Sequence, residues 1–322
     1  MPPTAAGRRC AARGSGETAM ARWDRDSTPT IPDWFWTAVE TGRDEHTVEV
    51  EECDVFYRSW PGDAAKPAVL LIHGMNAHSG WWDFIAPQLL DEYRVVAMDL
   101  TGMGDSDYRY QYDAATYAAE IVGVCDAAGF DDDVLVVGHS FGGMMAAKAA
   151  NLFPDRFGAL VLVDSGIRHP DEPLKDPGVL MGGGRAKTYP DRHTAEGRFR
   201  LYPPQPCENR YIVEYIAKHS LMRVDGGWAW KFDEELPLTL KDGERQPEDY
   251  NALPLPVGII YGKQSESFSA RTLEYMLELL GPDVPVAGIE EAQHHVFLDQ
   301  PLAFVEALRG VLTTLRARMP GG

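Results

Sequence analysis

Short and wholly apolar runs recur along this chain at regular intervals. Six of them read AVLLIHG, RVVAMDL, DVLVVGHS, ALVLVDSG, PVGIIYG and VPVAGI. Runs of this length without polar alternation are typical of strands buried on both faces, as in a parallel sheet covered by helices. Upstream of them, VEVEEC and DVFYRSW predict an antiparallel opening pair, although the glycine usual in such a hairpin is missing.

Helical stretches separate the apolar runs. They are predicted over Asp113 to Ala128, Phe141 to Phe153, Ser269 to Leu280, and Pro301 to Arg316. No internal repeat is visible. The alternation of strand and helix predicts a doubly wound α/β sheet.

One connection is much longer than a simple crossover requires. About ninety residues, 167–256, separate ALVLVDSG from PVGIIYG, where a single helix is enough to join parallel strands. The segment is rich in proline, glycine and aromatic residues and contains one amphipathic stretch around Glu208 to Arg223. We interpret it as a folded insertion lying over the sheet. Its aromatic residues are expected to form its own core more often than a ligand cage.

The insertion divides the chain into predicted parts. The core is expected over residues 29–166 and 257–322, with 167–256 as the insertion. Residues 1–28 form a polar lead-in rich in glycine, alanine and arginine, which we expect to be disordered. Whether the protein starts at Met1 or Met20 stays open.

Composition narrows the possible partners. The 322 residues include 30 basic and 49 acidic side chains, for a net charge of −19, and 44% are hydrophobic. Such a charge disfavours nucleic acid and anionic membrane as partners, since both require a basic face. No apolar run reaches membrane-spanning length, and no apolar segment follows the N-terminal arginines, which argues against a secretory signal. A small molecule remains the expected partner; the oligomeric state stays open.

The cysteines indicate a compartment. Cys10, Cys53, Cys125 and Cys207 are scattered without CxxC spacing, so neither a disulfide framework nor a zinc site is expected. The nine histidines form no HExxH motif and no ligand triplet in the sequence, so no metal is expected either. No cofactor motif is complete. These features favour a cofactor-independent protein in the reducing cytoplasm.

The most informative stretch is VVGHSFGGMMAAKAA. Within it, Gly138 to Gly142 matches G-x-S-x-G, and it follows an apolar strand and precedes a helical stretch, as a nucleophile elbow requires. The glycines allow strand and helix to approach closely. Ser140 is therefore predicted at the carboxyl edge of the sheet, at the positive end of the following helix.

A serine hydroxyl needs a base, and the base needs an acid. The adjacent His294 and His295, after the last strand, are the candidates; we favour His294, with His295 as the alternative. The acid is expected either after PVGIIYG, where Glu266 is the nearest carboxylate, or at the end of ALVLVDSG, where Asp164 stands. We favour Asp164, because its strand should neighbour the strand of the elbow.

The oxyanion formed by acyl transfer needs two backbone N–H donors. Phe141, directly after the nucleophile, is predicted to supply one, and Met75, after His73-Gly74, the other. The candidates for the wall of a substrate pocket are His73, Asn76, Trp81, Trp82 and His139. For His73, a role in organising the loop is the stronger expectation, and a Trp–Trp pair is at least as often plain packing.

Together these residues resemble the α/β-hydrolase superfamily from about Ile31 to Arg316. The order Ser…acid…His, the HG loop and the turn in YRVVAMDLTGMGDSD carry the resemblance. It implies a mostly parallel eight-stranded sheet and a largely helical cap domain formed by the insertion. Members with an acid after the strand that follows the nucleophile support Asp164. The chain departs from the family at Gln293, usually glycine, and at Ser265, often aspartate.

The resemblance also excludes some activities. Epoxide hydrolases and haloalkane dehalogenases require an aspartate nucleophile where Ser140 stands. The leading hypothesis is therefore a serine hydrolase, most similar to carboxylesterases, that cleaves an ester of a small to medium, fairly apolar molecule through an acyl-enzyme. Two alternatives stay open: C–C bond hydrolysis or a lyase reaction with the same triad, and a binding protein whose chemistry has lapsed.

Overall fold

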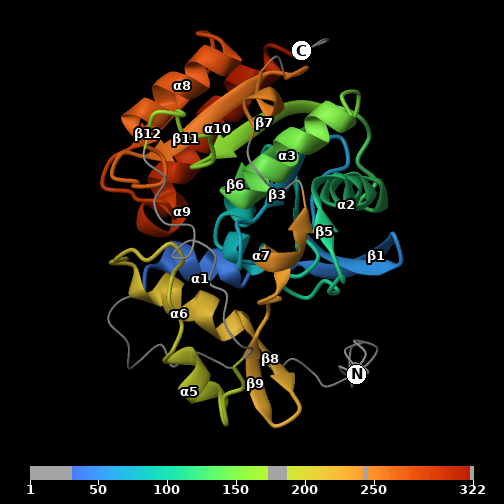
Figure 1. The fold of residues 1–322 in the computed structure, drawn as a ribbon, viewed down its shortest axis with the longest axis vertical. Coiled ribbons are helices and arrows are strands. Elements are labelled where there is room, and N and C mark those ends of the chain that lie inside the picture. The colour runs from blue at the N-terminus through green and yellow to red at the C-terminus, as the bar shows by residue number, and fades with distance from the viewer. Residues whose placement is uncertain (1–30, 173–186, 242–245, 252, 320–322) are drawn as a thin grey trace.

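The computed structural model describes residues 31–172, 187–241, 246–251 and 253–319 (Figure 1). The predicted lead-in and its two candidate start residues lie outside these ranges. Among the described residues, no helix combines the length and the apolar character needed to cross a bilayer.

An eight-stranded sheet forms the centre of the protein. In spatial order its strands are β1 (Asp44–Val50), β2 (Cys53–Ser59), β4 (Arg94–Met98), β3 (Ala68–Ile72), β6 (Val134–His139), β7 (Phe157–Val163), β11 (Val257–Gly262) and β12 (Val286–Ile289). The pairs β1–β2 and β2–β4 are antiparallel, and all later pairs are parallel. The mostly parallel eight-stranded sheet is therefore confirmed.

Helices cover both faces of the sheet (Figure 1). They are α1 (Asp33–Val39) and α10 (Pro301–Arg316) on one face, and α2 (Ala114–Ala127), α3 (Phe141–Leu152) and α8 (Ala270–Leu280) on the other. Successive strand residues point to opposite faces, so in β3 Val69 and Leu71 enter one core, and Leu70 and Ile72 the other. This two-sided burial explains why the central strands are apolar throughout.

The predicted helices begin and end close to their expected bounds. Asp113 caps α2 by accepting a hydrogen bond from the N–H of Thr116 (2.8 Å), and Ser269 caps α8 through the N–H of Thr272 (3.0 Å). The sequence pattern missed α1, because seven residues are too few to establish a helical period. Its Phe35 is 1% exposed and packs against Tyr215 of the insertion at 5.6 Å between ring centroids.

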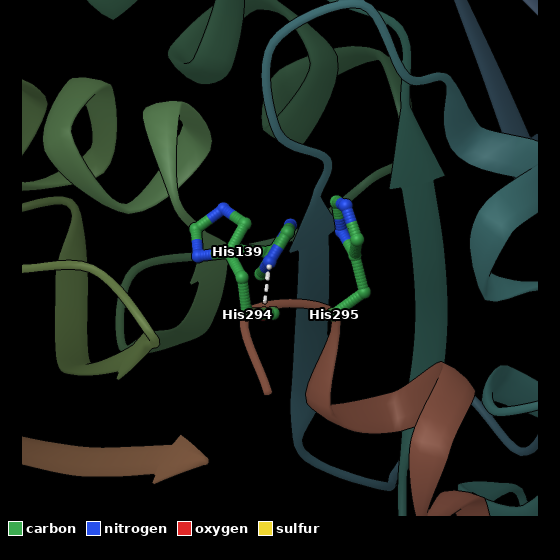
Figure 2. A group of neighbouring side chains, drawn as sticks. All are labelled: His139, His294 and His295. Carbon is green, nitrogen blue, oxygen red and sulfur yellow. Dashed lines mark hydrogen bonds between the residues drawn. The ribbon is translucent and has the colours of Figure 1, made fainter. Parts of the chain in front are cut away.

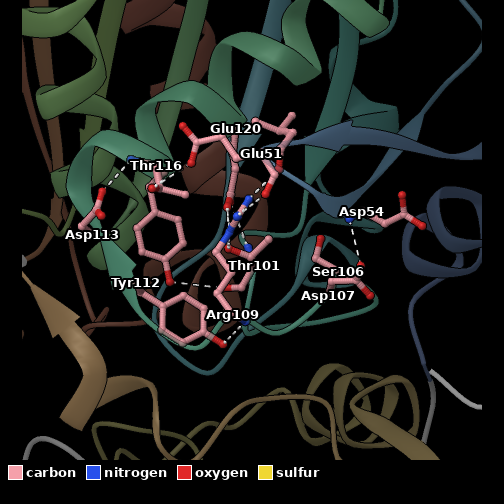
Figure 3. Close-up of polar contacts among 12 residues, drawn as sticks. Glu51, Asp54, Thr101, Ser106, Asp107, Arg109, Tyr112, Asp113, Thr116 and Glu120 are labelled. Carbon is pink, nitrogen blue, oxygen red and sulfur yellow. Dashed lines mark hydrogen bonds and ion pairs between the residues drawn. The ribbon is translucent and has the colours of Figure 1, made fainter. Parts of the chain in front are cut away.

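The β1–β2 hairpin turns without glycine. Glu51 and Glu52 both have positive φ, 48° and 63°, a conformation that costs a non-glycine residue roughly 1–2 kcal/mol. Arg109 stabilises the turn by donating hydrogen bonds to the carbonyl oxygens of Glu51 (2.9 Å) and Val50 (2.8 Å) (Figure 3). The same guanidinium forms an ion pair with the buried Glu120 (3.0 Å). This network explains how the hairpin forms without its usual residue.

The segment between β7 and β11 folds as short elements, and its part over 192–230 forms one end of the molecule (Figure 1). They are α5 (Arg192–Glu196), α6 (Arg210–His219), β8 (Leu221–Val224), β9 (Gly227–Trp230), α7 (Leu236–Thr239) and β10 (Leu240–Lys241). The predicted amphipathic helix is α6, which ends earlier than expected because β8 begins at Leu221 and pairs antiparallel with β9. A hairpin thus accompanies the expected helix.

Smaller elements complete the chain between the strands. They are η2 (Ser79–Trp82), η3 (Ala86–Leu89), β5 (Tyr112–Asp113), η4 (Pro247–Asp249) and α9 (Val296–Asp299). The two-residue strands β5 and β10 pair in parallel, which joins the insertion to the loop before α2.

A buried polar cluster attaches α6 to the core. Asp83 is fully buried and accepts hydrogen bonds from Arg58 (2.8 Å) and from the hydroxyl of Tyr215 in α6 (2.7 Å), with Arg43 at 3.3 Å. Burial opposes the charge of Asp83, but the two guanidiniums outweigh it and hold the pKa of this carboxyl below its usual value. This buried cluster of one carboxylate, two guanidiniums and a hydroxyl therefore joins the insertion to the core.

Candidate active site

The turn between β6 and α3 has a strained backbone. Ser140 has φ 51° and ψ −113°, which a non-glycine residue adopts only where its surroundings enforce it. A Cβ added to Gly138 would lie 2.4 Å from the Cα of Gly143, and one added to Gly142 would lie 2.4 Å from the carbonyl oxygen of His73. Only glycine fits these contacts, so the glycines allow strand, helix and neighbouring loop to close around the serine.

Backbone contacts with the next strand hold the elbow in place. The N–H of Ser140 donates to the carbonyl oxygen of Val163 (3.0 Å), and the hydroxyl of Ser165 donates to the carbonyl oxygen of Ser140 (2.6 Å). Ser165 was not singled out from the sequence. Ser140 itself is half-buried, whereas its neighbours His139 and Phe141 are buried. The serine is therefore the accessible residue of this turn.

The structure brings Asp164 and His294 together at the same edge of the sheet. Asp164 directly follows β7, and its Oδ1 lies 2.8 Å from Nδ1 of His294, which is 130 residues further along the chain. The side chain of Asp164 is fully buried, and that of His294 is 7% exposed. Because a carboxylate accepts, Nδ1 of His294 carries the donated proton and its Nε2 is left as the basic nitrogen.

Two further donors orient the carboxylate. The hydroxyl of Ser265 donates to Oδ1 of Asp164 (2.7 Å), and the N–H of Gly262 donates to Oδ2 (3.0 Å). Ser265 occupies the position where the family often has its acid, so the hydroxyl there supports the acid from the neighbouring strand. Glu266 is exposed and contacts Arg168 through its backbone carbonyl (3.3 Å). The geometry thus pairs His294 with Asp164 and not with Glu266.

The backbone on either side of His294 is held by side chains. The N–H of Gln293 donates to Oδ2 of Asp299 (2.7 Å), and the N–H of His295 donates to Oε1 of Gln205 (2.9 Å). The amide nitrogen of Gln205 in turn donates to Asp299 Oδ2 (2.8 Å). Gln205 belongs to the insertion, so the insertion helps to fix the loop over residues 293–295, which we call the histidine loop.

Three imidazoles meet beside this loop (Figure 2). Nε2 of His139 lies 3.0 Å from the carbonyl oxygen of His294, and one ring nitrogen from each of His139, His294 and His295 lies within 4.8 Å of the others. No local sequence pattern indicates this triplet, because His139 lies 155 residues before His294 in the chain. Such nitrogens are capable of binding a metal ion, but the contacts of His139 and His294 with protein oxygens favour a role in positioning His294.

His295, the alternative base, lies in a different environment. It is 2% exposed and lies beside the backbone carbonyl groups of Tyr202 and Pro203. Burial, with the neighbouring His294 and His139, lowers its pKa well below the usual value. No described carboxylate orients this ring, so the arrangement favours His294.

The loop after β3 packs directly against the elbow. Nδ1 of His73 donates to the carbonyl oxygen of Gly74 (2.7 Å), and its Nε2 accepts from the N–H of Leu100 (3.1 Å). A Cβ added to Gly74 would lie 3.3 Å from Cβ of Ser140. Burial lowers the pKa of His73, so this ring is neutral and organises the loop that carries Met75.

The turn after β4 also supports that loop. The carboxylate of Asp99 accepts hydrogen bonds from the N–H groups of Asp105 (2.8 Å) and Ser79 (2.5 Å). Gly104 has φ 64°, and a Cβ on it would lie 2.0 Å from Oδ2 of Asp99. The Gly-rich turn therefore has a structural role beside η2.

A cavity of about 210 Å³ lies between the core and the insertion. The core contributes Met75, Asn76, His78 and Trp81 to its wall, and the insertion contributes aromatic and basic side chains. Ser140 and His294 do not line the cavity themselves, but Met75 follows Gly74, which packs against the elbow.

Not every predicted pocket residue lines this cavity. Asn76 and Trp81 do. Trp82 is fully buried and stacks on Phe297 with 4.5 Å between ring centroids. The buried rings of His73 and His139 bind backbone carbonyl oxygens and do not line the cavity. Of the Trp–Trp pair, one ring faces the cavity and the other is core.

Comparisons with known proteins agree with the fold. Residues 69–307 match the model of the Alpha/beta hydrolase family. A protein of Mycobacterium tuberculosis named an esterase is 28% identical over 269 residues, 79% of this chain and 85% of its own. The 2-(acetamidomethylene)succinate hydrolase of Mesorhizobium japonicum is 27% identical over 71% of this chain and 82% of its own. A solved structure of E-2-(acetamidomethylene)succinate hydrolase superposes with a TM-score of 0.70 at 23% identity, covering 84% of this chain and 100% of the other.

The fold, together with the residues gathered at the carboxyl edge of the sheet, is that of a hydrolase. This chain belongs to the alpha/beta hydrolase family.

Proposed function

We propose that this protein is a serine hydrolase that cleaves a carboxylic ester through an acyl-enzyme. The observation that carries the proposal is the 2.8 Å contact between Asp164 and His294, at the same edge of the sheet as the strained elbow of Ser140. A buried carboxylate paired with an imidazole holds one tautomer and stabilises the imidazolium that forms during acyl transfer.

The proposed catalytic steps depend on Nε2 of His294, the ring nitrogen that Asp164 does not bind. Nε2 accepts the proton of the Ser140 hydroxyl as the oxygen attacks the ester carbonyl carbon, and it then passes that proton to the leaving alcohol. Water attacks the acyl-enzyme with the same base, releasing the acid and restoring Ser140. The carboxylate of Asp164 stabilises the imidazolium in both steps.

The developing oxyanion is assigned to two N–H groups. Phe141 is the first residue of α3, so its N–H has no partner within the helix and lies at the positive end of the helix dipole. Met75 follows Gly74, which packs on Ser140. One such donor typically contributes a factor of about 10²–10³ to the rate.

The size and lining of the cavity support a small to medium substrate with an apolar body. The ring centroids of Phe199 and Trp230, both in the insertion, lie 5.6 Å apart, and that of Trp81 in the core lies 6.5 Å from Phe199. We therefore infer that the insertion acts as a cap that closes over the substrate.

The proposal includes a cytoplasmic location and a small molecule as the partner, with neither nucleic acid nor membrane. Cys53, Cys125 and Cys207 are free thiols, which suits a reducing compartment. Recovery of the protein with a cytoplasmic marker after cell fractionation tests the location; recovery with secreted proteins contradicts it.

A fluorophosphonate probe tests the activity. It is expected to label the wild type at Ser140 and to leave Ser140→Ala unlabelled. Equal labelling of both proteins contradicts the proposal. Tight ligand binding without labelling would favour a lapsed binding protein, a result that the intact Asp164–His294 pair argues against.

A further inference from the structure

The cavity wall has a charge opposite to that of the whole chain. The protein has a net charge of −19, yet three basic side chains of the insertion, Arg198, Arg200 and Lys231, line the cavity. Among the described lining residues there is no aspartate or glutamate. A basic wall on an acidic protein attracts an anion to this place.

Arg198 has no acidic partner in the described part of the chain. The nearest carboxylate in sequence, Glu196, forms an ion pair with Arg192 (2.9 Å), and Asp191 caps α5 through Thr194 (2.8 Å). No described residue forms an ion pair or a side-chain hydrogen bond with Arg198. Its guanidinium is thus available to a ligand.

The other two basic side chains are held near it. Nη1 of Arg200 donates to the carbonyl oxygens of Gly197 (3.2 Å) and Phe199 (2.6 Å), which keeps the guanidinium at this turn. Lys231 forms an ion pair with Asp105 of the core (2.7 Å), so its charge is partly neutralised. The two arginines therefore supply most of the positive charge of the wall.

The apolar side of the wall orients a ligand relative to these charges. The ring centroids of Trp81 and His295 lie 5.3 Å apart, and Met75 follows Gly74, which packs on Ser140. This part of the cavity wall therefore borders the elbow and the histidine loop. The arginines belong to the part of the cavity wall that the insertion contributes. A substrate with its ester at the elbow would extend its far end toward them.

We propose that the substrate carries a carboxylate at the end remote from the ester, and that Arg198 and Arg200 bind it. The proposal rests on the proposed function and defines its substrate class: a monoester of a dicarboxylic acid, or a similar ester that bears an acid. A guanidinium binds a carboxylate through charge-assisted and often bidentate hydrogen bonds, which makes arginine the suitable residue here.

The test compares monomethyl adipate with dimethyl adipate, which has the same chain and no charge, by the methanol released. The wild type is expected to prefer the monoester by about tenfold or more in kcat/KM, and the double variant Arg198→Gln/Arg200→Gln to lose that preference, mainly through KM. Arg223→Gln is the control, because Arg223 is exposed on β8 and does not line the cavity. The preference should also shrink as salt is raised.

A second measurement separates this proposal from the proposed function. Adipate itself is expected to bind Ser140→Ala in calorimetry and to bind about tenfold more weakly when both arginines are also replaced. Equal turnover of the two esters, with arginine variants like the wild type, overturns the anion site while fluorophosphonate labelling of Ser140 upholds the hydrolase. Absent labelling overturns the hydrolase, and adipate binding then still decides the anion site.

Discussion

The edge of the sheet and the wall of the insertion are built in opposite ways. At the edge, the elbow, Asp164 and the histidine loop each have two or more hydrogen-bond partners from neighbouring strands and loops. On the insertion side, the aromatic and basic residues of the cavity are mostly half-buried or exposed. A preorganised edge suits a fixed reaction, and a less constrained wall suits the selection of substrates.

The contrast predicts that the largest losses come from the edge. Ser140→Ala should reduce kcat for p-nitrophenyl acetate by about 10⁴–10⁶, because the nucleophile is removed. Alanine carries a Cβ as serine does, so the fold should be kept, and an unchanged melting temperature serves as the control. Turnover within tenfold of the wild type would move the nucleophile elsewhere.

The acid is the next test. Asp164→Asn should reduce kcat by about 10³–10⁴, because an amide at this position no longer stabilises the imidazolium. The matched variant Glu266→Gln should retain nearly full activity, since that side chain is exposed. The reverse pattern in steady-state kinetics would assign the acid to Glu266.

A smaller effect is expected where the two regions meet. Gln205→Leu removes the acceptor for the N–H of His295 and the donor to Asp299, so His294 should be held less well. We expect kcat to fall about tenfold with little change in KM, and the pH–rate profile to shift. Gln264→Leu, an exposed position, is the control. An effect on KM alone would make Gln205 a substrate contact.

The smallest effect concerns acid stability. The pKa of His295 is lowered in the folded state, so the unfolded chain binds this proton more readily as the pH falls below about 6.5. Folding should therefore lose up to about 1.4 kcal/mol per pH unit from this residue below that value. His295→Phe should lessen the loss between pH 7 and pH 5 in urea unfolding and keep activity within a few-fold. Loss of activity would instead mark His295 as the base.

More of the catalytic edge of the sheet than of the insertion could be predicted from the sequence. Buried strands, capped helices and the elbow glycines leave local patterns, and Asp164 and His294 each follow a recognisable strand. Gln205 and Ser165 leave no such pattern, since their roles come from contacts formed only on folding. The Glu51–Glu52 turn lacks the usual glycine signal for the same reason: Arg109, far along the chain, stabilises it.

Mass spectrometry of the protein quenched during turnover of p-nitrophenyl acetate tests most directly whether Ser140 forms the acyl-enzyme. One acetyl group is expected on the peptide that contains Ser140, and none on that peptide of Ser140→Ala. Acetylation only at other residues, or ester turnover that persists in Ser140→Ala, would contradict it.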